Sequence, residues 1–227
     1  MILAVTIVLG FPIIFFLALF PFRVRFAFIR SWTCLVRNLA KWICGIRFKI
    51  EGLENIPAGP VLIFSRHESA WETLAFSDWF PMNGFVIKKE LLSIPLLGWA
   101  FRVSKHIAID RGRGVKAMMS LIKQGKTRAQ EGISLIVFPE GTRMAQGEFR
   151  ALHKGGAGLA KALELPVVPV VHNAGGCWKR NGFVKYPGCI SVKVGKPISP
   201  EHIRALSIDQ LNEEVLSWFK ANYPTEH

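Results

Sequence analysis

The chain has 227 residues, half of them apolar, which is enough for one large domain or for a domain with an appendage. Its 29 basic and 16 acidic side chains give a formal net charge of +13, which indicates an anionic partner such as a membrane surface, a phosphorylated substrate or nucleic acid. Four cysteines without a Cys-x-x-Cys spacing argue against a disulfide-stabilised scaffold.

The first segment of the chain is apolar. Residues 1–22 contain no charged side chain and are long enough to cross a bilayer, which takes about 20 residues. A signal peptide is disfavoured because no basic residue precedes the apolar run and no small-residue cleavage site follows it. Gly10 and Pro12 interrupt the run, so a kinked or half-inserted helix is an alternative to a spanning one.

The second segment is basic and aromatic. Residues 23–49 carry arginine and lysine but no acidic residue, and Trp32, Leu35, Leu39 and Trp42 recur at helical spacing. This pattern predicts an amphipathic helix at a membrane interface, with a core-facing helix as the alternative. By the positive-inside rule, we expect this basic segment and the chain that follows it to lie in the cytoplasm. No nucleic-acid-binding motif accompanies the basic residues, so we expect no nucleic-acid partner.

From residue 46 onward, short apolar runs alternate with helical patterns. We expect strands at residues 46–50, 61–64, 85–87, 106–109, 134–138, 167–171 and 190–194, and helices at residues 69–80, 115–129, 157–163 and 209–221. The alternation predicts a layered α/β domain with a parallel or mixed sheet flanked by helices. Pro169 lies inside one of these runs, which predicts an edge strand or a bulge.

These patterns divide the chain near residue 46. We expect residues 1–45 to form a membrane-associated pair or hairpin, consisting of an inserting apolar helix and a basic amphipathic helix. We expect residues 46–227 to form the α/β domain.

Polar side chains follow several of the predicted strands. His67 follows the strand at 61–64, and a helix beginning at Ser69 would bring Glu72 within reach of its imidazole. Open α/β folds place their binding crevices at this edge of the sheet, and histidine is well suited to proton transfer. Ser69 and Glu72 also fit a capping box, which is the alternative explanation of the same residues.

The sequence from Phe138 to Arg143, Phe-Pro-Glu-Gly-Thr-Arg, downstream of the His67-x4-Glu72 element, resembles the glycerolipid acyltransferase family. The nearest type is the bacterial 1-acyl-sn-glycerol-3-phosphate (lysophosphatidic acid) acyltransferase. Four blocks of that family occur here in order: 67–72, 109–111, 138–143 and 167–170. The family usually has aspartate where this chain has Glu72.

The resemblance implies that residues 46–227 are a catalytic domain. It would transfer a fatty acyl group from acyl-CoA or acyl carrier protein to the free hydroxyl of lysophosphatidic acid, giving phosphatidic acid. His67 would be the general base, and Glu72 would orient its imidazole. The alternatives are the same chemistry on another lysophospholipid or lyso-aminolipid, and a non-catalytic membrane-anchored phospholipid-binding protein. No metal site and no cofactor are expected.

The acceptor phosphate requires cations, and Arg143 is the first choice because guanidinium pairs bidentately with phosphate. The expected phosphate- and glycerol-binding residues are Glu140, Gly141, Thr142, Arg143, Arg111, Lys105 and Lys154. Glu140 would accept from a glycerol hydroxyl or hold Arg143 in place. The acyl chain would lie between the N-terminal helices and an apolar stretch that includes Leu92, Leu97, Gly98 and Trp99. We expect the enzyme at the bacterial inner membrane, with the catalytic domain on the cytoplasmic face.

Overall fold

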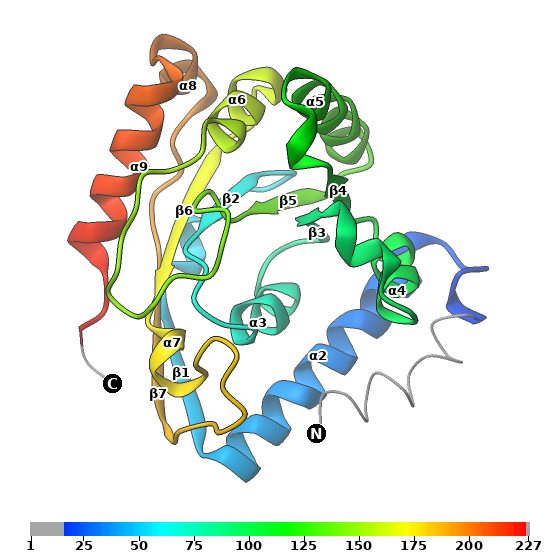
Figure 1. Cartoon of the computed structure of the whole chain (residues 1–227), viewed down its shortest axis with the longest axis vertical. Coiled ribbons are helices and arrows are strands. Elements are labelled where there is room, and N and C mark those ends of the chain that lie inside the picture. Colours follow the sequence, from blue (N-terminus) through cyan, green and yellow to red (C-terminus); the bar gives the residue numbers. More distant parts are fainter. Residues whose placement is uncertain (1–15, 226–227) are drawn as a thin grey trace.

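The computed structural model describes residues 16–225, so most of the predicted membrane segment at residues 1–22 lies outside the described residues. The described part is a seven-stranded sheet in the order β1-β7-β6-β2-β5-β3-β4, with helices on both faces (Figure 1). All neighbouring strands pair in parallel except β6 and β7, which are antiparallel. The predicted α/β class with a mixed, mostly parallel sheet is confirmed.

Each of the predicted strands is present. The strands are β1 (Ile46–Glu51), β2 (Leu62–Ser65), β3 (Asn83–Lys88), β4 (Ile107–Ile109), β5 (Ser134–Val137), β6 (Val167–His172) and β7 (Gly188–Val194). The α-helices are α2 (Phe22–Cys44), α3 (Trp71–Trp79), α4 (Leu97–Val103), α5 (Val115–Gln130), α6 (Lys154–Leu163), α7 (Ala174–Cys177), α8 (Pro200–Ala205) and α9 (Ile208–Asn222). Short 3-10 turns occur at η1 (Leu53–Asn55), η2 (Lys89–Ser93) and η3 (Arg111–Arg113).

Strand β2 shows why the run at residues 61–64 is continuously apolar rather than alternating between apolar and polar residues. Ile63 packs with α3 residues such as Phe76 on one face of the sheet, whereas Leu62 and Phe64 pack with α5, α6 and α9 on the other. A central strand of a parallel sheet is covered on both faces, so every position is buried.

The prediction of an edge strand at Pro169 is wrong, because β6 lies between β7 and β2 in the interior of the sheet. The ladder between β6 and β7 is interrupted after Val194 and resumes only as a bridge from Val167 to Ile198. Pro169 lies opposite this interruption, where its carbonyl accepts from the Gly195 amide at 2.8 Å. A proline without an N–H is therefore tolerated in a central strand.

Helix α2 is tied to the α/β body. Asp78 on α3 binds Arg30 at 3.1 Å and also pairs with Arg37, whose guanidinium lies 4.9 Å from the Phe48 ring. The outer side of α2 carries exposed apolar residues, with Trp42 80% exposed. Within residues 16–225, no helix combines the length and apolar character needed to cross a bilayer.

Candidate active site

His67 lies in the loop between β2 and α3, at the carboxyl edge of the sheet. Its Nδ1 is 2.8 Å from Oε1 of Glu72 in the first turn of α3. The imidazole stacks on the Phe138 ring with centroids 4.0 Å apart. Its backbone is also held, since the amide donates to Glu140 at 2.9 Å and the carbonyl accepts from Met144 at 2.7 Å. The ring therefore has one fixed orientation.

Glu72 is fully buried and reaches the imidazole of His67, whereas the predicted capping box does not form, because the N-cap of α3 is Ala70 and has no side-chain cap. Besides meeting His67, its Oε1 accepts from the amides of Ser69 at 2.8 Å and Glu68 at 3.0 Å, and Oε2 accepts from the Ser69 hydroxyl at 2.9 Å. The Ser69 hydroxyl in turn accepts from the Trp71 amide, so α3 begins at Trp71 rather than at Ser69. The longer glutamate side chain thus reaches the imidazole and also binds the backbone of the loop that precedes α3.

The charge on Glu72 determines which ring nitrogen of His67 carries the proton. Burial alone would raise the pKa of Glu72, but His172, the hydrogen bond from His67 and the Ser69 amide lower it to about 2. A carboxylate can only accept, so Nδ1 of His67 carries the proton and Nε2 on the opposite side of the ring is the free base. The His67 side chain is 17% exposed and lines a cavity.

This cavity has a volume of about 560 Å³ and lies between α2, β3 and α4. Its lining falls into an apolar class and a cationic class. The apolar class includes Phe28, Ile29, Trp32, Leu91, Leu97 and Phe101, and the cationic class consists of Lys88, Arg111, Arg143 and Arg180.

The four cations come from separate parts of the chain. Arg111 donates to the Gly141 carbonyl at 2.8 Å, and burial lowers its pKa. Arg180 donates to the Arg143 carbonyl at 2.9 Å, so the loop after α7 supports the loop after β5. Sequence reasoning named Arg111 and Arg143 and missed Lys88 and Arg180. Lys88 is the last residue of strand β3, and its position at a strand end could have identified it as a site residue. Nothing in the sequence indicated Arg180.

Three of the expected acceptor-binding residues lie elsewhere. Lys105 pairs with Glu131 at 2.6 Å, and Lys154 pairs with Asp209 at 2.9 Å, and neither lines the cavity. Glu140 is fully buried and does not line the cavity, and its ion pair is with Arg66 rather than with Arg143. It accepts from the backbone amide of His67 instead. The structure therefore corrects these placements.

The loop after β5 has a conformation that requires glycine. Gly141 has φ +73°, and a Cβ there would lie 2.6 Å from the His153 ring and 2.8 Å from the Arg111 guanidinium. Thr142 and Arg143 follow on the cavity wall. Within the described residues, no backbone carbonyl accepts from the amides of Thr142 and Arg143.

The apolar stretch contributes to the cavity only in part. Leu97 lines it, but Leu92, Gly98 and Trp99 do not. A Cβ on Gly98 would lie 2.1 Å from the Leu92 carbonyl oxygen, so Gly98 is needed for the packing of α4 on η2. The wall across from this stretch is helix α2.

A buried charge cluster beneath the site was missed in the sequence. Arg66 is fully buried, 3.3 Å from Glu68 and 3.5 Å from Glu140, with its guanidinium over the rings of Phe149 and Tyr223. Burial raises the pKa of Glu68 to about 8 and that of Glu140 to about 7, although Arg66 opposes both shifts. One guanidinium neutralises one carboxylate, so the cluster holds a proton at neutral pH. No sequence pattern revealed it, because fully buried arginines are rare.

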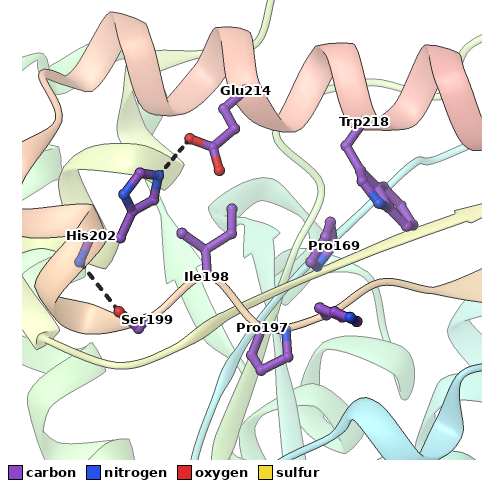
Figure 2. A pocket seen from close by; sticks show the side chains of 8 residues that line it. Pro169, Pro197, Ile198, Ser199, His202, Glu214 and Trp218 are labelled. Carbon is purple, nitrogen blue, oxygen red and sulfur yellow. Dashed lines mark hydrogen bonds and ion pairs between the residues drawn. The ribbon is translucent and has the colours of Figure 1, made fainter.

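A second cavity of about 650 Å³ lies between α8, α9 and the chain that follows β7 (Figure 2). The Trp218 indole lies beside Pro169 there, and Glu214 binds His202 at 2.9 Å (Figure 2). It shares no lining residue with the first cavity and brings none of the cations together. Among residues 16–225, no three His, Cys, Asp or Glu side chains are grouped to hold a metal ion.

With this geometry in view, comparison with known proteins places the chain. A family model described as Acyltransferase matches residues 47–173. The chain is 40% identical to the 1-acyl-sn-glycerol-3-phosphate acyltransferase of Pseudomonas aeruginosa over 206 residues, which is 90% of this chain and 80% of that protein. It is 32% identical to the protein of the same name from Limnanthes douglasii, over 84% of this chain and 68% of the relative.

The fold also matches a solved structure. The crystal structure of the 1-acyl-sn-glycerophosphate (LPA) acyltransferase PlsC from Thermotoga maritima superposes with a TM-score of 0.77 and 24% identity, covering 97% of this chain and 89% of that one. The family match extends over more than half of the chain, and the bacterial relative over most of both proteins. The chain therefore belongs to the acyltransferase family.

Proposed function

We propose that the protein transfers a fatty acyl group from a thioester to the free hydroxyl of lysophosphatidic acid, giving phosphatidic acid. The observation that carries the proposal is the 2.8 Å contact between Nδ1 of His67 and Glu72, at a cavity that also exposes four cations. The relatives from Pseudomonas aeruginosa and Limnanthes douglasii carry the name of this activity.

The reaction begins with a weak nucleophile, because an alcohol is not ionised at neutral pH. Nε2 of His67 takes the hydroxyl proton as the oxygen attacks the thioester carbonyl, and Glu72 stabilises the imidazolium that forms. When the C–S bond breaks, the leaving thiolate takes the proton from His67. The products are the ester and free thiol, and no covalent acyl-enzyme is needed.

The developing oxyanion needs donors that are not already engaged. In the described part of the chain, the backbone amides of Thr142 and Arg143 bind no backbone carbonyl, and both residues lie on the cavity wall. They are better suited than Lys105, whose ammonium pairs with Glu131.

The cations favour a phosphate monoester as the acceptor headgroup. Arg111 and Arg143 supply planar donor pairs, and Lys88 and Arg180 add charge at the same cavity. A zwitterionic lysophospholipid would bring its own cation into this group and lose binding energy, so it is the weaker acceptor. A non-catalytic lipid-binding protein would not need the oriented His67–Glu72 pair.

Association with a membrane follows from the same substrate. Residues 1–45 would hold the protein at the bilayer, and residues 46–227 would carry out catalysis at the cytoplasmic face of a bacterial inner membrane. The exposed apolar side chains on α2, including Trp42, and the cavity wall formed by the same helix support this arrangement.

The test is a panel of lysolipids offered to the purified full-length protein with one acyl thioester, with thiol release as the readout. We expect lysophosphatidic acid to be used at least tenfold better than lysophosphatidylcholine or a lyso-aminolipid. Equal use of all acceptors would contradict the headgroup assignment, and no time-dependent thiol release would contradict the enzyme assignment. Repeating the panel with acyl carrier protein in place of CoA identifies the donor.

A further inference from the structure

A loop of residues 178–187 joins α7 to β7 and exposes three large apolar side chains. Phe183 is 83% exposed, Val184 is 58% exposed and Tyr186 is 44% exposed. Apart from Arg180, the proposed chemistry uses none of these residues. Adjacent exposed apolar side chains at a loop tip mark a contact site.

The loop is held in shape from within. The Gly182 amide donates to the Lys179 carbonyl at 3.2 Å, and the Tyr186 amide donates to the Cys177 carbonyl at 2.9 Å. The Lys185 ammonium donates to the carbonyls of Gly182 at 2.6 Å and Phe183 at 3.1 Å. The tip is therefore presented to solvent by a formed turn.

The charge of this region is of one sign. Lys179, Arg180 and Lys185 flank the apolar tip, and no acidic residue occurs between residues 165 and 200. An apolar tip with basic flanks fits the interface of an anionic bilayer, where the apolar side chains enter the acyl boundary and the cations meet phosphate. An acidic protein partner would require cations at the tip, where Phe183 and Val184 lie.

The position of the loop connects two features already described. Its end lies against the end of α2, where the Gly188 amide donates to the Gly45 carbonyl at 3.2 Å (Figure 1). There α2 exposes Trp42 and Ile43, 80% and 61% exposed. At its start, Arg180 lines the active-site cavity and donates to the Arg143 carbonyl at 2.9 Å.

We propose that the loop of residues 178–187 is a second membrane-contacting element, which inserts Phe183 and Val184 into an anionic lipid surface beside the end of α2. Arg180 then receives the phosphate of a lipid that passes from the surface into the cavity. This inference rests on the proposed function only in taking the substrate to be a lipid.

The test measures the depth of the tip in a bilayer. The full-length variants Phe183→Trp and Met119→Trp are bound to vesicles of phosphatidylglycerol and phosphatidylethanolamine with brominated acyl chains. The protein without either substitution gives the background emission of its seven tryptophans. Met119 is the matched control because it is 66% exposed on α5, at the opposite end of the molecule from α7 (Figure 1).

We expect the added emission of Phe183→Trp to shift to shorter wavelength and to be quenched at least twofold more than that of Met119→Trp. Equal quenching of the two variants, or no binding of the protein to these vesicles, would overturn the proposal. An emission shift with acyl carrier protein but none with vesicles would overturn it in favour of protein docking. Because the assay contains no turnover step, its failure is distinguishable from failure of the transferase assignment.

Discussion

Replacing Glu72 with glutamine isolates the charge of the carboxylate from its shape. A glutamine oxygen in place of Oε1 would keep the hydrogen bonds from His67, Ser69 and Glu68, which are 2.8 to 3.0 Å long. The amide nitrogen would meet the Ser69 hydroxyl, which can turn to accept. We therefore expect Glu72→Gln to fold and to retain the orientation of the imidazole.

What the variant loses is the attraction between the carboxylate and the imidazolium. Two unit charges about 4 Å apart at an effective dielectric constant of about 20 attract by roughly 4 kcal/mol. That attraction exists only once His67 has taken the proton, so it lowers the barrier rather than binding the substrate. A loss of about 4 kcal/mol corresponds to a fall in kcat of about 10³-fold, with the KM for the acceptor unchanged.

The assay is initial-rate thiol release with lysophosphatidic acid at pH 7. Glu68→Gln is the matched control, because it removes a neighbouring buried carboxyl that burial already keeps largely protonated and that does not touch the imidazole. Glu72→Asp keeps the charge but moves it away from the imidazole by about one C–C bond, ~1.5 Å. Its kcat should lie between those of Glu72→Gln and Glu68→Gln. A Glu72→Gln enzyme within fivefold of the parent kcat would refute the reasoning.

Three further outcomes are expected. Arg143→Ala should raise the KM for lysophosphatidic acid by roughly 10- to 100-fold with kcat nearly unchanged, because a charge-assisted hydrogen bond contributes about 1.5–3 kcal/mol. In the same kinetic assay, Lys154→Ala should change neither constant. Leu97→Trp should shift acyl preference toward shorter chains, by roughly tenfold in kcat/KM, because a longer chain would lose the contacts of about two methylene groups. Ile94→Trp should leave the preference unchanged, because Ile94 does not line the cavity. Glu68 has a pKa raised to about 8, so the stability it contributes is present below pH 4.5 and falls as the pH rises to 8; Glu68→Gln should flatten thermal stability over that range, and an unchanged pH profile would contradict a protonated Glu68.

The strands were predictable because burial on both faces of the sheet leaves a simple pattern. The runs at β2, β5 and β6 are apolar except for one residue at an end of each strand, and all of their positions are buried. Pro169 was misjudged because the interruption that accommodates it lies in the partner segment after Val194, which residue order alone does not reveal.

The candidate site was only partly predictable for a related reason. Sequence proximity to a motif says which backbone is near, but not where a long side chain turns. Lys105 and Lys154 lie close to motif residues, yet each turns to an acidic partner on another helix or turn. Arg180 reaches the site from a loop 37 residues after Arg143, and Arg66 is buried against aromatic rings from distant segments.

The most direct test of the central claim is the turnover of His67→Ala in a protein that still folds and binds vesicles. His67 is the only group assigned to take the proton, so single-turnover acylation of lysophosphatidic acid should fall by at least 10²-fold, the lower end of a general-base contribution, while binding of the acceptor is retained. A folded, vesicle-bound His67→Ala enzyme that turns over at close to the parent rate would contradict the account.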